Sequence, residues 1–138
     1  MKKLDSLEPN WYAETCFYIL DINGIVKFGI TSNWARRKKA YEKEINGVGL
    51  RILKQEIYDT RWKAELLEQI VKWRLRPWVI KGRHEWIDAP IQMIFDCYNQ
   101  TRNEIVPEIH KYEYIHKKGN DRWDYYRQIA DISFKKAI

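Results

Sequence analysis

Two short runs of apolar, β-prone residues flank a turn sequence near the start of the chain. Residues 17–20 form the first run, Asp21-Ile22-Asn23-Gly24 supply the turn, and residues 25–30 form the second run. Asp favours the start of a turn, whereas Asn and Gly tolerate positive φ. The pattern predicts a β-hairpin. Because a hairpin decides which side chains become neighbours, this stretch constrains the fold more than any other.

The hairpin register follows if the bend centres on Ile22 and Asn23. Tyr18 then lies opposite Lys27, and side chains of directly opposed residues share a face of the sheet. The other face is expected to be the buried one and to hold Phe17, Ile19, Val26 and Phe28. We therefore expect Tyr18 and Lys27 to be neighbours on the more polar face.

The segments after the hairpin alternate between helix and strand. Asn33 is expected to cap a helix that runs to about Asn46, with Gly47 as its stop. Residues 50–58 have the composition of a third strand. Thr60 is expected to cap a helix over residues 61–75, which Pro77 ends. The apolar stripe of that helix consists of Trp62, Leu66, Leu67, Ile70, Val71 and Trp73.

The last part of the chain has a helical pattern. Glu85-Trp86-Ile87 is expected to form a short strand or extended segment, and Pro90 starts a helix. Breaks are expected at Pro107 and at Gly119-Asn120, before a last amphipathic helix. The resulting fold class is α+β, with a small three-stranded antiparallel sheet flanked by helices and a carboxy-terminal helical extension.

Positive charge is concentrated in two segments of a chain whose formal net charge is +6. Residues 27–40 hold five basic and no acidic residues, and residues 58–85 hold seven basic and four acidic residues. A solubilising surface would explain scattered charge, but an acid-free cluster favours an anionic partner.

Several functional classes lack their signatures in this sequence. The three histidines and two cysteines (Cys16, Cys97) lack the paired spacing of zinc ligands, and no Gly-rich phosphate loop occurs. The amino terminus has no apolar segment typical of a signal peptide, and no apolar run approaches the roughly 18 residues of a membrane span. We therefore expect a cytoplasmic protein with reduced cysteines and no membrane partner.

Five short sequence elements, taken together, resemble the GIY-YIG nuclease superfamily. They are Tyr18-Ile19-Leu20, Lys27-Phe28-Gly29-Ile30-Thr31, Arg37 eight residues after Gly29, Ala64 to Glu68, and Glu85-Trp86-Ile87. The second is similar to the Lys-Ile-Gly-x-Thr motif of the branch common in phages and mobile elements. The chain departs from the family where Cys16-Phe17 replaces Gly-Ile, and no terminal Asn follows the catalytic helix. The resemblance covers about residues 12–90.

This resemblance implies a role for each of four residues. Tyr18 would be the general base or would orient the water, and Lys27 beside it would favour its phenolate. Arg37 would bind the scissile phosphate. Glu68 would be the single protein ligand of Mg²⁺ or Mn²⁺. Glu65 is the alternative metal ligand, and His84 is a candidate for assistance near the site.

The resemblance therefore implies a Mg²⁺-dependent endonuclease that hydrolyses DNA, with double-stranded DNA as the partner. Residues 1–90 would form the nuclease domain, and residues 91–138 a helical extension packed on it. The expected contacts to nucleic acid are Arg36, Lys38, Lys39, Lys72 and Arg74. Three alternatives stay open: a catalytically weak module that binds DNA or a host protein, a structural subunit, and RNA as substrate. The extension would be packing, a DNA clamp, or a surface for a homodimer or protein partner.

Overall fold

The computed structural model describes residues 9–44 and 49–137, without the side chains of His84 and residues 133–137. The expected helix end at about Asn46, the stop at Gly47 and the side chain of His84 therefore lie outside the described residues. In chain order, the elements are β1 (Thr15–Ile22), β2 (Ile25–Thr31), α1 (Trp34–Glu44), β3 (Leu50–Tyr58), α2 (Arg61–Arg74), η2 (Arg76–Trp78), β4 (Val79–Ile80), β5 (Arg83–Ile87), α3 (Ile91–Ile105), η3 (Val106–Asp121) and α4 (Arg122–Ala137).

One antiparallel sheet forms the centre of the α+β fold, with the strand order β3-β1-β2-β5-β4. The prediction of a three-stranded sheet is corrected, because the described residues form five strands. The two additional strands are short, and β5 pairs with β2 only through Val26 with Ile87 and Lys27 with Trp86. Glu85-Trp86-Ile87 was expected as a short strand or extended segment and belongs to the strand β5, but such brief pairing depends on tertiary placement, so its place in the sheet was not predicted.

The β1–β2 hairpin turns through Asn23 and Gly24, whose φ values are 54° and 90°. Two consecutive positive φ values make a tight two-residue turn whose twist matches the strands. Asp21 supports it by accepting a hydrogen bond from the Gly24 amide at 2.7 Å. The register therefore differs by two residues from the expected one. Tyr18 lies opposite Gly29, and Lys27 lies opposite Leu20.

A shift of two residues preserves which side chains share a face, because side chains alternate along a strand. The face with Phe17, Ile19, Val26 and Phe28 is buried in the main core, as expected. The other face is not the polar surface that the sequence indicated. Tyr18, Leu20 and Ile22 are buried there in a second cluster together with Tyr41 of α1.

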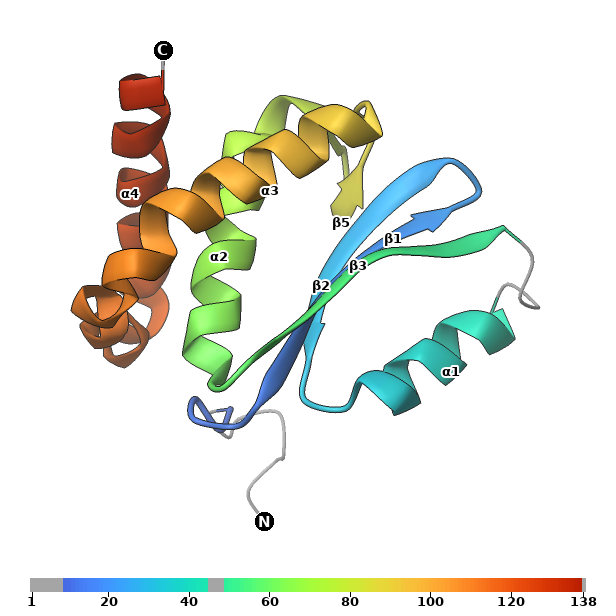
Figure 1. Ribbon diagram of the computed structural model, residues 1–138, viewed down its shortest axis with the longest axis horizontal. Helices are drawn as coiled ribbons and strands as arrows, with labels where there is room; N and C mark the ends of the chain where they lie inside the picture. Colours follow the sequence, from blue (N-terminus) through green and yellow to red (C-terminus); the bar gives the residue numbers. More distant parts are fainter. Residues whose placement is uncertain (1–8, 45–48, 138) are drawn as a thin grey trace.

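The helices lie on both sides of this sheet (Figure 1). Helix α1 covers one face, and the layer of α2, α3, η3 and α4 covers the other. Asn33 caps α1 as expected, because the Arg36 amide donates to its Oδ1 at 3.1 Å. Thr60 precedes α2 but forms no side-chain capping bond.

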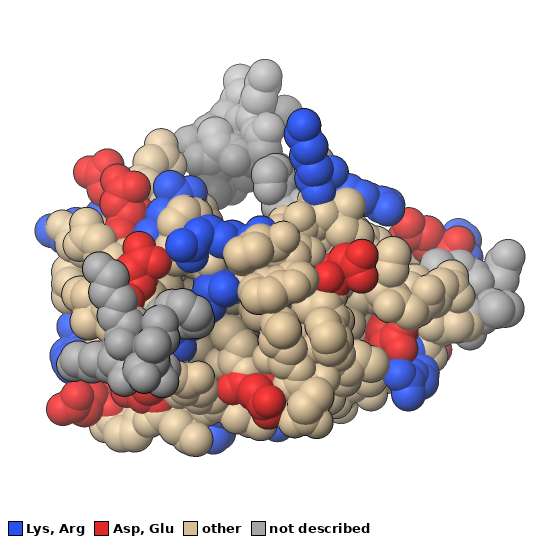
Figure 2. Space-filling view, turned by 90° about the horizontal axis from the view of Figure 1, so that it is seen from above, with Lys and Arg blue, Asp and Glu red and all other residues tan. Residues whose placement is uncertain are grey.

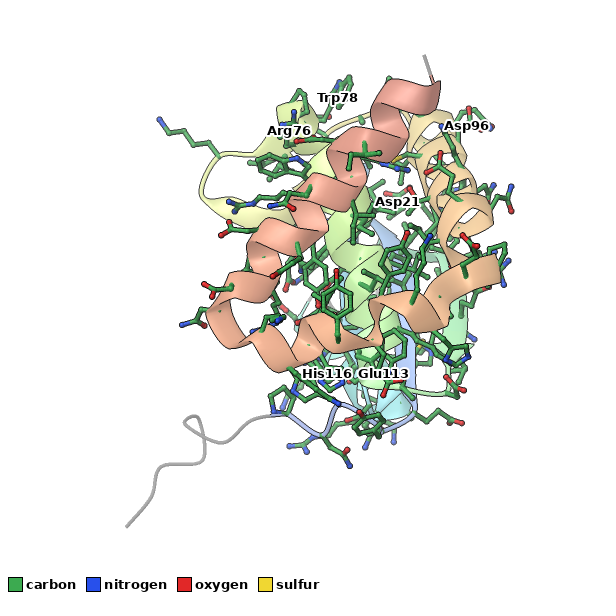
Figure 3. The ribbon with its side chains drawn as sticks, turned by 90° about the vertical axis from the view of Figure 1, so that its left-hand side faces the viewer. Asp21, Arg76, Trp78, Asp96, Glu113 and His116 are labelled. Carbon is green, nitrogen blue, oxygen red and sulfur yellow. The ribbon has the colours of Figure 1, made fainter. Side chains whose placement is uncertain are left out.

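The carboxy-terminal helices join the main core. Buried side chains of this part include Ile94, Tyr98, Ile105, Ile109, Ile115, Tyr126 and Ala130. Figure 3 views this layer and shows α4 and η3 in front of α2. Near the labelled Glu113 and His116 of η3, the Tyr12 hydroxyl donates to Glu113 Oε2 at 3.0 Å, which ties this layer to the segment before β1. Among the described helices, none combines the length and apolarity needed to cross a membrane.

Candidate active site

A polar pocket of about 300 Å³ opens where the pairing between β2 and β5 ends. Beyond Lys27, the edge of β2 is not paired with β5, so side chains from both faces of the sheet can meet there. The residues that line the pocket are Tyr18, Gly29, Ile30, Arg37, Arg61, Glu65, Glu68, Gln69, Lys72 and Glu85. Three of the four residues that the resemblance singled out, Tyr18, Arg37 and Glu68, are therefore brought together.

Tyr18 reaches the pocket by crossing the neighbouring strand at Gly29. A Cβ built on Gly29 would overlap with the phenol of Tyr18, so the ring occupies the space that a side chain would fill. The backbone of Gly29 does not have a positive φ. Gly29 is therefore required by this close approach and not by an unusual backbone conformation.

The hydroxyl of Tyr18 is held by Tyr41. The two hydroxyl oxygens are 2.7 Å apart, and the Tyr18 ring also packs against Trp34 with ring centroids 4.9 Å apart. Burial is the main reason that the pKa of Tyr18 lies well above its ordinary value, and the hydrogen bond with Tyr41 raises it further. The nearby charge of Arg37 acts in the opposite direction. The phenol is therefore neutral in the protein as it stands.

Contrary to the expectation from the sequence, Lys27 does not lie opposite Tyr18. Its ammonium lies 3.7 Å from Glu85 Oε2, and it sits over the rings of Tyr41 and Trp86 at 4.7 and 5.0 Å from their centroids. It is not among the residues that line the pocket. The two-residue register shift is the cause, because it moves Lys27 opposite Leu20. Lys27 can position Tyr41 and Glu85, whereas Arg37 is the cation that acts on Tyr18.

The two candidate metal ligands on α2 have different surroundings. Glu65 accepts hydrogen bonds from Arg122 Nε at 3.0 Å and from the Tyr126 hydroxyl at 2.8 Å, so its charge is compensated by α4. Glu68 is 5% exposed and accepts a hydrogen bond from its neighbour Gln69 at 3.1 Å. Among the described residues, no lysine or arginine forms an ion pair with Glu68. Of the two carboxylates, Glu68 is therefore the one whose charge no ion pair compensates in the described part of the chain.

Burial raises the pKa of Glu68 to about 7. Lys72 acts against this shift, whereas the negative charges of Glu85 and Glu65 add to it. A buried carboxylate with such a pKa favours either a proton or a metal ion as its partner. No group of three or more His, Cys, Asp and Glu side chains with metal-binding geometry occurs in the described ranges. A cation held by Glu68 would take its other ligands from water and phosphate oxygens, as Mg²⁺ commonly does.

The basic residues expected to contact nucleic acid fall into three groups. Lys72 lines the pocket. Arg36, Lys38 and Lys39 lie on α1 outside the pocket lining, with Arg36 and Lys39 exposed. The prediction that Arg74 contacts nucleic acid is corrected, because Arg74 is buried. It is 6% exposed and donates hydrogen bonds to Thr101 at 2.6 Å and to Glu104 at 2.7 Å. Its position near the end of α2 suggested a surface residue, but α3 and α4 cover it.

Two residues that shape this site were not singled out in the sequence, although spacing could have indicated them: Arg61 lines the pocket, and Tyr41 holds the Tyr18 hydroxyl without lining it. Tyr41 follows Arg37 by one helical turn, so both project from the same side of α1. Arg61, Glu65, Glu68 and Lys72 are spaced by four, three and four residues, which places them along one side of α2. The buried Nε of Arg61 has no hydrogen-bond partner among the described residues. This polar stripe, on a helix that is otherwise mostly apolar, is the sequence signal that identifies the side of α2 that faces the pocket.

The pocket thus combines three cations with carboxylates at the edge of a sheet. Arg37, Arg61 and Lys72 can attract a phosphate group, and Glu68 can hold a divalent cation beside it. The Tyr18 hydroxyl reaches the same space. Comparisons of the chain with protein-family models, with curated proteins and with solved structures found no match.

Proposed function

We propose that the chain is a divalent-metal-dependent endonuclease of the GIY-YIG type that hydrolyses phosphodiester bonds in DNA. The observation that carries this proposal is the joint lining of one polar pocket by Tyr18, Arg37 and Glu68. These residues come from β1, α1 and α2, and together they span 50 positions along the chain, from Tyr18 to Glu68. Hydrophobic packing does not explain why a phenol, a guanidinium and a carboxylate without an ion pair among the described residues line one pocket.

Arg37 has the clearest role in this reaction. Its planar guanidinium can bind two oxygens of the scissile phosphate, and its charge stabilises the negative charge that develops as water attacks phosphorus. Arg37 is exposed and makes no ion pair among the described residues, so it is available for a phosphate. Lys72 lies across the same pocket and can compensate part of the remaining charge.

Tyr18 is better suited to orient the attacking water than to remove its proton. Because its pKa is raised, the phenol stays neutral, so it can form a hydrogen bond with a water molecule but offers no phenolate to take up a proton. Tyr41 fixes the direction of its hydroxyl through their hydrogen bond. The resemblance implies that Tyr18 is either the general base or the residue that orients the water. The environment of its hydroxyl supports the second role.

Glu68 fits the metal that this chemistry needs. Its carboxylate is buried, has no positively charged ion-pair partner in the described part of the chain and faces a polar pocket. A bound Mg²⁺ would supply Lewis acidity at the phosphate. Glu65 is a weaker candidate for the same role, because Arg122 and Tyr126 already use its oxygen.

A plasmid-nicking assay with Mg²⁺ tests the proposal directly. Arg37→Ala is expected to lower the rate by about 10²–10³, the usual cost of removing one donor that stabilises transition-state charge. Glu68→Gln is expected to abolish nicking. Arg36→Ala is the matched comparison: it removes the same charge one residue away, outside the pocket, and should weaken binding while nicking persists. Nicking that survives both Arg37→Ala and Glu68→Gln would refute this assignment.

A second candidate function is a nucleic-acid-binding module with the same pocket and no hydrolysis. The neutral, buried Tyr18 favours it, because a hydroxyl committed to Tyr41 can serve structure alone. This candidate predicts tight DNA binding that weakens steeply with salt, without nicking at any Mg²⁺ concentration. It also predicts that Tyr18→Phe leaves DNA affinity unchanged.

A further inference from the structure

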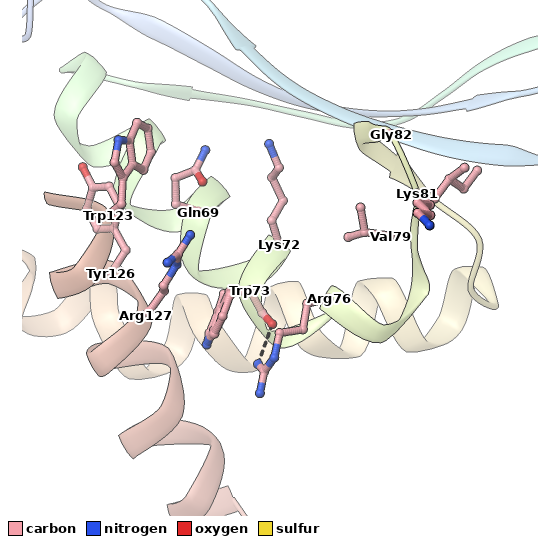
Figure 4. A pocket seen from close by; sticks show the side chains of 11 residues that line it. Gln69, Lys72, Trp73, Arg76, Val79, Lys81, Gly82, Trp123, Tyr126 and Arg127 are labelled. Atoms are coloured by element: carbon pink, nitrogen blue, oxygen red, sulfur yellow. Dashed lines mark hydrogen bonds between the residues drawn. The ribbon is translucent and has the colours of Figure 1, made fainter. Parts of the chain in front are cut away.

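A second, larger groove of about 860 Å³ lies beside the candidate active site, between α2, α4 and the β4–β5 hairpin. Figure 4 shows Lys72 and Gln69 extending from α2 into this opening, with Trp123 and Arg127 of α4 on one side and Lys81 on the other. The full lining consists of Gln69, Lys72, Trp73, Arg76, Val79, Ile80, Lys81, Gly82, Trp123, Tyr126 and Arg127.

The charged side chains that line this groove are all positive. Its lining contains four basic residues and no acidic one: Lys72, Arg76, Lys81 and Arg127. Asp131 lies nearby, where it accepts a hydrogen bond from the Trp73 indole at 2.9 Å and approaches Arg76 at 3.8 Å. On the face seen in Figure 2, Lys and Arg side chains border a hollow, with Asp and Glu side chains close to them, while the centre of this face is mostly uncharged. The charge complements an anionic ligand.

Aromatic rings alternate with these cations. The guanidinium carbons of Arg76 and Arg127 lie 4.3 and 4.7 Å from the ring centroid of Trp73. Trp123 is half-buried and contacts Arg122 in the same way at 4.2 Å. Guanidinium planes and indole rings both stack on unpaired bases, and the arginines can also bind the phosphates between them.

The groove is continuous with the candidate active site, because Gln69 and Lys72 line both. A strand whose scissile phosphate lies beside Arg37 therefore has a basic path past Lys72 toward Arg127. Arg76, Lys81 and Arg127 are exposed, so they can reach a ligand without rearrangement of the core.

We propose that this groove binds a single-stranded stretch of nucleic acid that flanks the scissile phosphate. The proposal rests on the proposed function and specifies its substrate class: a duplex with a single-stranded extension, in preference to a blunt duplex. Paired bases are stacked within a helix and offer only their edges and backbone to a protein, whereas unpaired bases can use both the planes and the charges of this groove.

The test compares binding of two labelled DNA probes by fluorescence anisotropy. One is a blunt duplex, and the other is the same duplex with an extension of about eight nucleotides, within the span that one such binding surface covers. All proteins carry Glu68→Gln so that cleavage does not interfere. The groove variant combines Lys81→Ser with Arg127→Ser. The control variant combines Lys111→Ser with Lys117→Ser, which removes equal charge from exposed positions outside the groove.

The extension is expected to tighten binding at least about fivefold in the parent protein, the gain from one stacked base. The groove variant should lose this gain, and its dependence of log Kd on log salt should flatten by about 1.4, because two contacts to single-stranded phosphates are removed. The control variant should keep the gain.

Three results would overturn the proposal: an extension that adds no affinity, an equal loss in the control variant, or displacement of the extended probe by polyglutamate as effective as that by single-stranded DNA. The last result would assign the groove to an acidic protein surface. Failure of the proposed function is distinguishable, because it would remove Mg²⁺-dependent nicking by the protein with native Glu68 and leave the extension-dependent binding intact.

Discussion

The burial of Glu68 leads to a quantitative prediction about stability. Its pKa of about 7 in the folded protein lies above the ordinary value of 4.5. A group whose pKa rises on folding contributes stability below the unfolded pKa, and this contribution is lost as the pH rises through the folded pKa. The difference between the two pKa values corresponds to about 3 kcal/mol. The charged form of Glu68 therefore destabilises the fold by about that amount above pH 7.

Replacing Glu68 with Gln keeps the shape of the side chain and removes this titration. We expect the variant to be about 3 kcal/mol more stable than the wild type at pH 8, and only about 1 kcal/mol more stable at pH 5. The measurement is urea unfolding of both proteins at several pH values between 4 and 9. The same substitution is expected to abolish nicking, so that a gain in stability accompanies a loss of activity.

Metal binding gives the corresponding control. Saturating Mg²⁺ at pH 8 should stabilise the wild type by mass action and leave Glu68→Gln unchanged. A difference in the free energy of unfolding between the two proteins that does not vary with pH would refute the reasoning. It would show that Glu68 does not titrate in a buried position. A difference of the opposite sign would indicate a cation partner for Glu68.

Three further predictions follow from the geometry of the same pocket. Gly29→Ala should lower the free energy of unfolding by about 1–3 kcal/mol in urea titrations, because its methyl group would overlap with Tyr18, and a loss below 0.5 kcal/mol would contradict that contact. Glu65→Gln should cost about 2 kcal/mol, since it weakens a buried bond to a charged arginine, and equal stability would show that the pairing with α4 is unimportant. At fixed Mg²⁺, the activity of the wild type should rise with pH through about 7 as Glu68 loses its proton, and a flat profile between pH 6 and 8 would argue against Glu68 as the metal ligand.

Much of the fold could be predicted from local patterns. β3 begins and ends where expected, α2 ends one residue early, and the hydrogen bond from the Arg36 amide to Asn33 confirms the predicted cap. The helix periods identified the buried stripe of α2 because 3.6-residue spacing leaves one continuous apolar side. β5 was expected as a short strand or extended segment, but its place in the sheet was not predicted, because its pairing with β2 joins residues far apart in the sequence. β4 has only two residues, which is too short for a periodic pattern.

The pocket itself was partly predictable. The motif order brought Tyr18, Arg37 and Glu68 into consideration, and all three line it. The prediction that Lys27 lies opposite Tyr18 was wrong because it depended on the turn type, and an Asn-Gly turn with two positive φ values moves every pairing by two residues. The prediction that Arg74 lies on the surface was wrong, because Arg74 is buried by contacts with α3 and α4.

The sequence by itself determined the elements: a hairpin, a basic helix, and a helix with one apolar and one charged side. These are local properties, decided by side-chain periodicity and turn chemistry. Only the tertiary structure decided that the second face of the hairpin is buried beneath α1 and that the ring of Tyr18 packs over Gly29. It also decided that Glu65 is paired with Arg122, whereas Glu68 has no ion-pair partner in the described part of the chain. The physical reason is that burial and charge compensation depend on which surfaces meet, and those surfaces come from segments far apart in the chain.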